Sequence, residues 1–426
     1  MTLKTLIVGI LVVAVSGSAA NGFADDSNDA VIMELKAMIE KQQEQLNLQQ
    51  QQIETLMNQV EAMTAEKATE TPAPQKAKDA PENSIRAGGD KIRSTIYAQV
   101  NRGVLYVNDG NTDELIPVDN DHSSTRIGIV GSAKMNSDIS VGTKIEVQFE
   151  SNSSSKVSQD NQSGVGPNNF TERHLDLFLK SEKMGKLSIG QGSTASDGTS
   201  EVDLSGTKVI SKSDQGDFAG GIKFFDRTTD ALSGLKIGAV VNNMDGLSRR
   251  DRLRYDTPTF GGFTLSGSVT ERKQQDLALR YKKTFPGFKL SGAIAYENLD
   301  ASATISNQYN GSISVLLNSG LNATIAAGYR DMIVSARKEP AFYYFKLGYR
   351  ADFFSAGKTS FAIDYGRFND IAQNDDQADT IGIVALQNLN SLATDLYIGY
   401  RFHSLDRPGS RFDDINAILT GARIKF

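Results

Sequence analysis

The stretch RRDRLRYDTPTFGGFTLSGSV, residues 249–269, decides how the chain folds. Its first part alternates with a period of two, as a β-strand does, so that one face carries arginine and the other carries apolar residues. The two sets are Arg250, Arg252 and Arg254 on one face and Leu253 and Tyr255 on the other. Turn residues follow at 257–262, and the alternation resumes at 263. The sequence therefore predicts a β-hairpin.

The arginine-bearing face of this strand restricts where the strand can lie. Burying an unpaired charge in a protein core costs several kcal/mol, so three neighbouring arginines do not fit the inside of a soluble sheet. If the apolar face meets lipid and the arginines meet water in a lumen, the charges stay hydrated and this cost disappears. The stretch therefore favours a transmembrane β-barrel with an aqueous interior.

The composition of the 426-residue chain excludes several other classes of protein. Because 39% of the residues are hydrophobic and the mean hydropathy is −0.33, nothing after the first ~20 residues can form a membrane-spanning helix. The mean hydropathy does not reveal membrane-spanning barrel strands, because their apolar residues alternate with polar ones. The chain has no cysteine, which excludes a disulfide framework and a thiolate metal site. A formal charge of −6 argues against a nucleic-acid partner.

The N-terminal part predicts a signal peptide and a linker. Residues 1–24 contain Lys4, then an apolar run and small residues, which is typical of a secretory signal cleaved after Ala20 or Ala24. The mature protein is therefore expected to leave the cytoplasm. Residues 68–90 hold three prolines and alternating charges, a composition typical of an extended or disordered linker.

Between these two segments, residues 25–67 predict a coiled coil. They contain no glycine or proline, and apolar residues recur every seven positions. At about 1.5 Å per residue the rod would be about 50 to 60 Å long. The apolar residues of this repeat are compatible with a trimeric coiled coil. The alternative to a coiled coil is a single helix exposed to solvent. The seam positions are Ile32, Ile39, Leu46, Ile53 and Val60, with Leu35, Gln42, Gln49, Leu56 and Met63 on the second row.

The region 91–426 predicts a sheet of sixteen strands, separated by polar loops. An even number of strands is what a closed barrel with both termini on one side requires. The fold class is therefore all-β, a transmembrane antiparallel β-barrel preceded by a helical coiled coil. The expected strands are 93–107, 124–134, 139–151, 170–182, 186–191, 250–257, 263–270, 276–283, 288–297, 308–318, 322–330, 342–351, 359–368, 379–389, 394–402 and 414–426.

The connections between these strands alternate between tight turns and long polar loops such as 108–123 and 152–169. This alternation is the pattern of outer-membrane barrels. One connection, about 192–249, is far longer than the others and includes the segments 193–206 and 235–241 and a short amphipathic stretch at 218–225. A loop of this length in a compact fold is usually functional.

Several motifs resemble the trimeric general porins of Gram-negative bacteria. In that family an arginine-bearing sixth strand leads into Tyr-Asp-Ser-Pro and then Phe-Gly-Gly-Phe. This chain has Tyr-Asp-Thr-Pro at 255–258 and Phe-Gly-Gly-Phe at 260–263. Segments that resemble the family's first, second and fifth strands are 96–100, 124–128 and 185–191. The resemblance covers about 93–426, and the N-terminal coiled coil and linker lie outside the common family pattern.

The resemblance implies a site inside the barrel. The long connection would be the family's third loop, which folds into the lumen and narrows it, so that its acidic residues face a row of arginines on the wall. Opposed charges across a narrow gap orient solutes and set ion preference. The expected acidic residues are Asp197, Glu201 and Asp203. The expected wall residues are Arg126, Arg173, Arg250, Arg252 and Arg254, of which Arg173 lies on a strand whose register is ambiguous by one residue.

The resemblance also implies a passive diffusion channel for small hydrophilic solutes and ions. It would be a homotrimer in the outer membrane of a Gram-negative bacterium, with the coiled coil in the periplasm. The last residue, Phe426, resembles the terminal aromatic signal by which such barrels are recognised for membrane insertion.

Two other functions stay open, and an enzymatic one is not expected. The arginines would serve as a binding ladder in a substrate-selective anion porin. Alternatively, the coiled coil and linker would tether the barrel to the envelope, with peptidoglycan as the partner. No cofactor or metal is expected, because the three histidines are isolated in the sequence. Residues 190–195 fit a G-x-G-x-x-A nucleotide fingerprint, but no apolar helix follows them.

Overall fold

The computed structural model describes residues 85–426, apart from 90, 164–168, 300, 301 and 303, together with Glu44 and Gln51. The chain divides into two compact units, Met1–Ala77 and Lys78–Phe426. In the first unit, Glu44 and Gln51 are helical and exposed. The expected signal peptide, coiled coil and most of the linker lie outside the described residues. None of the helices in the described part of the chain is long and apolar enough to cross a membrane.

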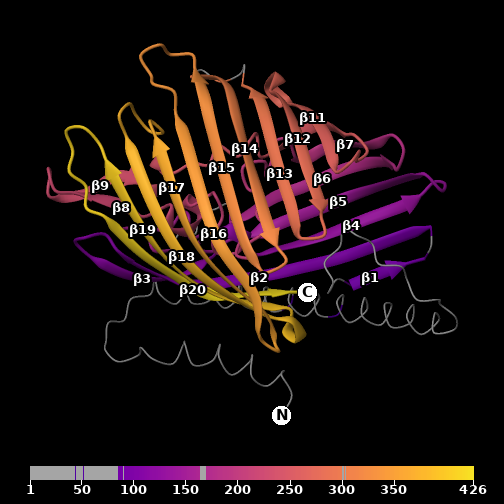
Figure 1. Cartoon of the computed structure of the whole chain (residues 1–426), viewed down its shortest axis with the longest axis horizontal. Coiled ribbons are helices and arrows are strands. Elements are labelled where there is room, and N and C mark those ends of the chain that lie inside the picture. Colours follow the sequence, from indigo (N-terminus) through magenta and orange to yellow (C-terminus); the bar gives the residue numbers. More distant parts are fainter. Residues whose placement is uncertain are drawn as a thin grey trace, which may run out of the picture. The chain divides into compact units, whose positions relative to one another are not determined.

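Across the described residues, sixteen long antiparallel strands form a closed barrel (Figure 1). Each pairs with the next barrel strand along the chain, and β2 pairs with both β4 and β20, which closes the ring. The strands are β2 (Ile92–Asn108), β4 (Arg126–Lys134), β5 (Ile139–Phe149), β6 (Phe170–Ser181), β7 (Gly185–Ser193), β10 (Arg249–Asp256), β11 (Phe263–Thr270), β12 (Gln275–Thr284), β13 (Phe288–Asn298), β14 (Ile305–Leu317), β15 (Leu321–Met332), β16 (Ala341–Phe354), β17 (Gly357–Asn369), β18 (Gln377–Leu389), β19 (Thr394–Asp406) and β20 (Ile415–Lys425).

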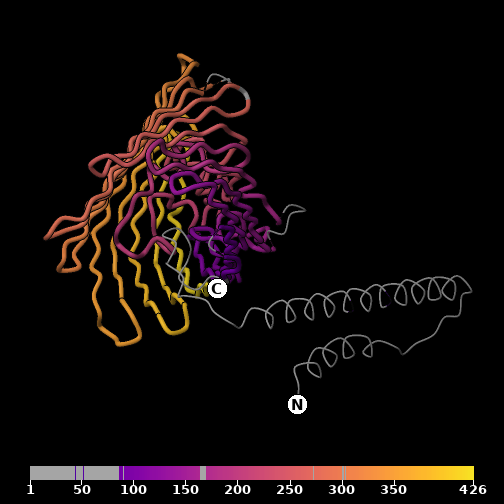
Figure 2. Tube along the Cα trace, turned by 90° about the vertical axis from the view of Figure 1, so that its right-hand side faces the viewer, coloured from indigo at the N-terminus to yellow at the C-terminus, as the bar shows by residue number. Residues whose placement is uncertain are grey.

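The predicted sixteen-stranded barrel is therefore confirmed, with strand ends shifted by a few residues. Figure 2 shows the strands of the C-terminal half, in orange and yellow, facing those of the N-terminal half, in indigo and magenta. The C terminus lies at the rim formed by the short turns, where the backbones of Phe426 and Ala98 exchange two hydrogen bonds of 2.9 and 3.3 Å.

Two short strands add to β2 outside the sixteen. β1 (Ile85–Gly88) pairs with the first part of β2, on the edge that β20 leaves free. β3 (Asp113–Asp119) pairs with the last part of β2, beyond the residues that pair with β4. Neither strand is among those expected from the sequence, because each is short and lacks a clear alternation.

The alternation of side chains along the strands follows the expected division between an outer and an inner face. On β10, Leu253 is 51% exposed and Tyr255 is 45% exposed, whereas Arg252, which precedes Leu253 and faces inward, is 6% exposed. Apolar residues recur on the outer face of the other strands, for example Ile294 and Ile383. This pattern places an apolar band outside and polar groups inside, as a bilayer requires.

The long connection between β7 and β10 folds back into the barrel. The connection contains the helices α3 (Gly216–Ala219) and α4 (Ile237–Val240) and a hairpin of β8 (Lys223–Asp226) and β9 (Ala231–Lys236). Other loops contain the short helices η1 (Asp121–Ser123), η2 (Glu271–Lys273) and η3 (Asn390–Leu392). The β8–β9 hairpin projects past β3 and β19 (Figure 1). There the backbone N–H of Asp413, in the β19–β20 loop, donates to the carbonyl of Phe225 at 3.0 Å.

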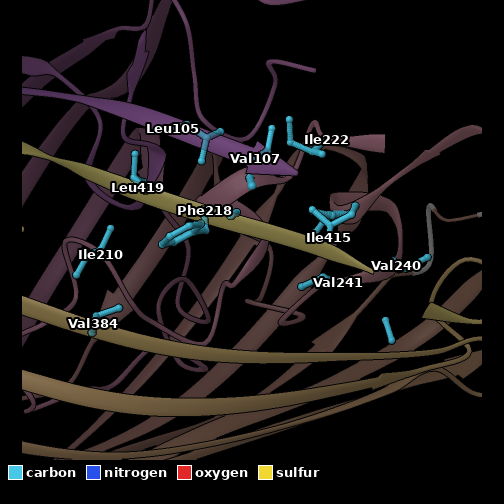
Figure 3. Close-up of a cluster of buried hydrophobic side chains, with 14 of the residues drawn as sticks. Leu105, Val107, Ile210, Phe218, Ile222, Val240, Val241, Val384, Ile415 and Leu419 are labelled. Carbon is cyan, nitrogen blue, oxygen red and sulfur yellow. The ribbon is translucent and has the colours of Figure 1, made fainter. Parts of the chain in front are cut away.

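A hydrophobic core lies inside one part of the barrel, between the folded connection and the inner wall (Figure 3). The connection contributes Phe218, Ile222 and Val240, and the wall contributes residues such as Leu105 and Ile415. These side chains are almost fully buried. The connection is therefore a packed unit held against β2, β3, β18, β19 and β20, and it fills much of that side of the lumen.

Candidate functional site

The first arm of the long connection is fastened to the inner wall by hydrogen bonds to serine and aspartate side chains. Ser196 donates its backbone N–H and its hydroxyl to Asp276 on β12, at 2.7 and 2.5 Å. Further along, the backbone N–H of Val202 donates to Ser312 Oγ at 2.8 Å, and that of Leu204 donates to Ser314 Oγ at 2.9 Å. Inward serines on β14 thus satisfy backbone groups of the arm, which otherwise would lie unpaired at this depth.

Two buried ion pairs hold the next part of the connection. Lys346 on β16 lies 2.7 Å from Asp203, and both side chains are nearly inaccessible to water. Arg401 on β19 lies 2.6 Å from Asp364 on β17. Asp364 also accepts a hydrogen bond of 2.6 Å from the hydroxyl of Ser211, which belongs to the connection. Because a buried charge is tolerated only when paired, these contacts fix the position of residues 203–211.

A cavity of about 940 Å³ remains between the connection and the opposite wall. Among the described residues that line it, nine are lysine or arginine and seven are aspartate or glutamate, so its surface is strongly charged. The basic residues are Arg126, Arg173, Lys208, Lys212, Arg249, Lys289, Arg330, Arg350 and Arg423. The acidic residues are Asp121, Asp197, Glu201, Asp203, Asp214, Asp217 and Asp245.

One side of the cavity is a basic wall built from the strands β20, β4, β6 and β10. Arg126, Arg173 and Arg423 project into the cavity from this wall. Glu146 on β5 lies among them and accepts a hydrogen bond from Arg173 Nε at 2.6 Å. Arg423 lies 2.6 Å from Asp395. These carboxylates neutralise part of the positive charge and hold the guanidinium groups in place.

The strand β6 contains a bulge that explains the position of Arg173. Glu146 on β5 is opposite His174, and the next residue, Val147, is opposite Glu172, so that Arg173 is the extra residue. A bulge changes which side a residue faces. Both Arg173 and His174 consequently face inward. The sequence left open which of two neighbouring positions on this strand faces the lumen, and the bulge places both of them there.

The other wall arginines expected from the sequence do not line the cavity. Arg252 lies 2.6 Å from Asp176 and also donates to the carbonyl of Gly190. Arg254 lies 2.7 Å from Asp256 and donates to the carbonyl of Thr194 at 2.6 Å. These two arginines therefore hold the root of the long connection.

Arg250 is exposed and lies outside the cavity lining, whereas its neighbour Arg249 lines the cavity. Arg249 is the first residue of β10 and follows Ser248, whose φ of 57° lies in the left-handed region. A residue in that region redirects the chain, and simple alternation cannot foresee the turn. The alternation predicted Arg250 as the wall residue at this position, whereas in the structure the preceding residue, Arg249, lines the cavity.

The expected acidic residues all lie on the connection and line the cavity. Glu201 is 2.9 Å from Lys212, and Asp203 is paired with Lys346 as described above. Asp197 makes no ion pair within the described residues, while its backbone carbonyl accepts a hydrogen bond from Arg280 at 2.7 Å. Two of the three acids are thus neutralised by lysines.

Asp214 and Asp245, on the same connection, were not among the expected site residues. Burial raises the pKa of Asp214 to about 6, although Lys212 opposes the shift. Burial, together with the charges of Glu201 and Asp197, raises the pKa of Asp245 to about 7. These carboxyl groups therefore gain or lose a proton near neutral pH.

All three histidines lie in the described part of the chain. In the part of the chain that the structure describes, no three histidine, aspartate or glutamate side chains are placed to hold an ion. His122 lines the cavity, and neither of its ring nitrogens has a hydrogen-bond partner in the protein. Burial holds the pKa of His122 well below its usual value, so the ring is neutral.

The sequence matches the family model described as Gram-negative porin over residues 84–407. The chain belongs to this family. Its fold is similar to an anion-selective porin from Comamonas acidovorans, with 16% identity and a TM-score of 0.53, over 79% of this chain and 100% of the other. It is also similar to OmpF of Salmonella typhi, with 13% identity and a TM-score of 0.53, over 80% and 100%. A trimer form of OmpT from Vibrio cholerae gives 12% identity and a TM-score of 0.51, over 79% and 100%.

No curated protein matches the sequence. The family and the fold nevertheless identify a porin of the outer membrane, a passive channel for small hydrophilic solutes and ions. They indicate a channel rather than an enzyme. The charged cavity lies inside the barrel, where such solutes must pass.

Proposed function

We propose that this porin is a diffusion channel that prefers anions. The observation that carries the proposal is the set of lumen cations without a carboxylate partner. Arg249, Lys289, Arg330 and Arg350 line the cavity and make no ion pair within the described residues, and the Nε atoms of Arg249 and Arg350 have no hydrogen-bond partner. Four positive charges thus remain without a carboxylate partner.

The negative side of the cavity is weaker than its sequence implies. Lys346 pairs with Asp203, and Lys212 is shared between Glu201 and Asp217, at 2.9 and 2.8 Å. Asp245 is partly protonated near pH 7, because its pKa is raised to about 7. The lumen therefore carries an excess of positive charge, which raises the local concentration of anions and lowers that of cations.

The site residues have distinct roles in this proposal. Arg126, Arg173, Arg249 and Arg423 form the basic side of the constriction, and Asp197, Glu201 and Asp203 form the acidic side. A solute with separated charges aligns between the two sides as it passes, whereas an anion follows the basic wall. Arg252 and Arg254 act as positioning residues at the root of the connection.

We further propose that the protein acts as a homotrimer in the outer membrane, as the trimer form of OmpT supports for a barrel of this fold. Leu253 and Tyr255 then face lipid or a neighbouring subunit. Phe426 is 54% exposed at the short-turn rim, which leaves it accessible for its predicted role as an insertion signal. The coiled coil would lie in the periplasm, where tethering to peptidoglycan stays a second candidate role for residues 25–90.

The zero-current potential of the reconstituted full chain in a KCl gradient tests the proposed preference. A potential displaced toward the equilibrium potential of chloride supports it. A potential displaced toward that of potassium contradicts it. No charge outside the cavity should be needed to explain the sign, because such charges are screened within about 10 Å at 0.1 M salt.

A further inference from the structure

We infer that Lys208 is a selectivity-determining residue of this channel. It supplies a positive charge from the long connection itself, on the side of the cavity that also carries the acidic residues Glu201 and Asp203. This inference rests on the proposed anion preference and names a residue that sets it. Passing anions therefore meet positive charge on two sides of the cavity, from Lys208 and from the basic wall.

The backbone around Lys208 is held in place. The backbone N–H of Ile210 donates to the carbonyl of Thr207 at 2.9 Å, which closes a turn around Lys208. The carbonyl of Val209 accepts a hydrogen bond of 2.7 Å from Nδ2 of Asn120, the residue that caps η1. The side chain of Lys208 therefore starts from a fixed point in the lumen.

Lys208 is accessible to water, whereas its neighbours in the turn are buried. Thr207, Val209 and Ile210 are at most 2% exposed, and the side chain of Lys208 is 47% exposed. Val209 and Ile210 belong to the hydrophobic core between the connection and the wall. Because the core holds these neighbours, the lysine side chain extends the other way, into the cavity that it lines.

The charge of Lys208 is not tied to a carboxylate. Among the described residues, Glu201 is the carboxylate within ion-pair distance of Lys208, and it lies 4.0 Å away. Glu201 is closer to Lys212, at 2.9 Å, and the side chain of Lys212 is only 12% exposed. An ion pair exposed to water contributes about 0–1 kcal/mol, so the long contact does not hold the ammonium group of Lys208 in place. A passing anion can therefore approach it.

The helix η1 connects the turn to the basic wall. Asn120 at its start binds the turn, and Ser123 at its end accepts a hydrogen bond of 2.8 Å from Arg423 on β20. A 3₁₀ helix rises about 2.0 Å per residue, which places these two contacts about 6 Å apart along the helix. Lys208 and Arg423 consequently border the same part of the cavity, one from the connection and one from the wall.

This position changes what the cavity favours. A lumen with acids on one side and arginines on the other gives cations a path along the acidic side. Lys208 places a positive charge on that side, beside Glu201, and so weakens the attraction for cations there. Lys208 therefore shifts the ion preference of the cavity toward anions, although it belongs to the segment that carries the acids.

A labelled cysteine tests the charge at this position directly. The chain contains no cysteine, so a single introduced thiol can be labelled selectively. In planar bilayers with the full chain, Lys208→Cys should lower the ratio of chloride to potassium permeability about threefold, because a lumen charge is lost. A methanethiosulfonate reagent that carries a trimethylammonium group should return the ratio toward wild type. A reagent that carries a sulfonate group should lower it further.

Lys236→Cys is the matched control. Lys236 is an exposed lysine of β9 on the same connection, and it is not among the residues that line the cavity. Neither the substitution nor the two reagents should change the permeability ratio at this position. In 1 M KCl, where charges are screened within about 3 Å, unlabelled Lys208→Cys should conduct like wild type, since the connection stays in place.

The two reagents separate the charge of Lys208 from any structural effect of the substitution. Both act on the same folded variant, so opposite shifts of the permeability ratio depend on the added charge. The inference is overturned if Lys208→Cys keeps the wild-type ratio, or if both reagents shift the ratio in the same direction. A wild-type channel that prefers chloride, together with an unaffected Lys208→Cys, would overturn the role of Lys208 alone. A wild-type channel that prefers potassium would overturn the proposed function.

Discussion

At the scale of the residue, two adjacent arginines differ in their relation to the cavity. Arg249 lines the cavity, whereas Arg250 is exposed and is not among the residues that line it. Arg249→Gln should reduce the ratio of chloride to potassium permeability about twofold, because one of the free lumen charges is lost. Arg250→Gln should leave the ratio unchanged. Equal effects of the two substitutions on the zero-current potential would contradict the placement of Arg249.

The protonation of Asp245 should make the ion preference depend on pH. Its pKa is raised to about 7, so the carboxyl is charged above that pH and neutral below it. Lowering the pH from 8 to 5 removes negative charge from the cavity, and the preference for chloride should therefore increase. Permeability ratios measured across this range check the sign.

Asp245→Asn is the variant that assigns this pH dependence. At pH 8 it should already show the stronger chloride preference, and the remaining change should centre nearer pH 6, where Asp214 titrates. If the variant keeps the full pH dependence of the wild type, Asp245 is not the titrating group.

At the scale of the element, the long connection is a fixed part of the barrel rather than a free loop. Its position depends on the pair of Lys346 and Asp203, whose side chains are both nearly inaccessible to water. Lys346→Met leaves the Asp203 charge buried and unpaired, which should cost about 3–5 kcal/mol. The connection should then loosen, with a larger and noisier single-channel conductance and a lower melting temperature.

The double substitution Lys346→Met with Asp203→Asn tests whether this cost arises from the lone charge. It removes both charges. It should therefore restore most of the thermal stability and reduce the noise of the single-channel current. Wild-type conductance and melting temperature in Lys346→Met alone would show that the pair does not hold the connection.

The sequence predicted the barrel better than it predicted the connection. Period-two alternation found all sixteen strands, since each has one face toward lipid and one toward the lumen. The connection has no such period. Phe218 and Ile222 are buried against the wall because the chain is folded back on itself, and nothing local in the sequence records that packing.

For the site as well, the sequence predicted some residues and missed others, and residues next to irregular backbone were among those missed. The acidic residues Asp197, Glu201 and Asp203 were predicted from the family resemblance, and in the structure all three line the cavity. Arg249 and Lys289 were missed, the first because the chain turns at Ser248. Arg350 and Lys289 face the lumen, and they line the cavity only because the connection folds back into the barrel. The alternation along their strands does not record this.

At the scale of the whole molecule, the apolar core and the charged cavity divide the interior of the barrel. The core occupies the space between the connection and β18, β19, β20, β2 and β3 (Figure 3). Solutes are left with the polar cavity. Because the connection is packed rather than free, the charges that line this cavity keep fixed positions, and a fixed excess of positive charge gives a lasting ion preference.

The zero-current potential of the full chain, measured in KCl gradients of decreasing mean concentration at pH 7, tests this account most directly. The account predicts a potential of the sign given by chloride preference, and a preference that grows as salt is lowered, because fewer ions screen the lumen arginines. A potential near zero at every salt concentration, or one of the opposite sign, would contradict it.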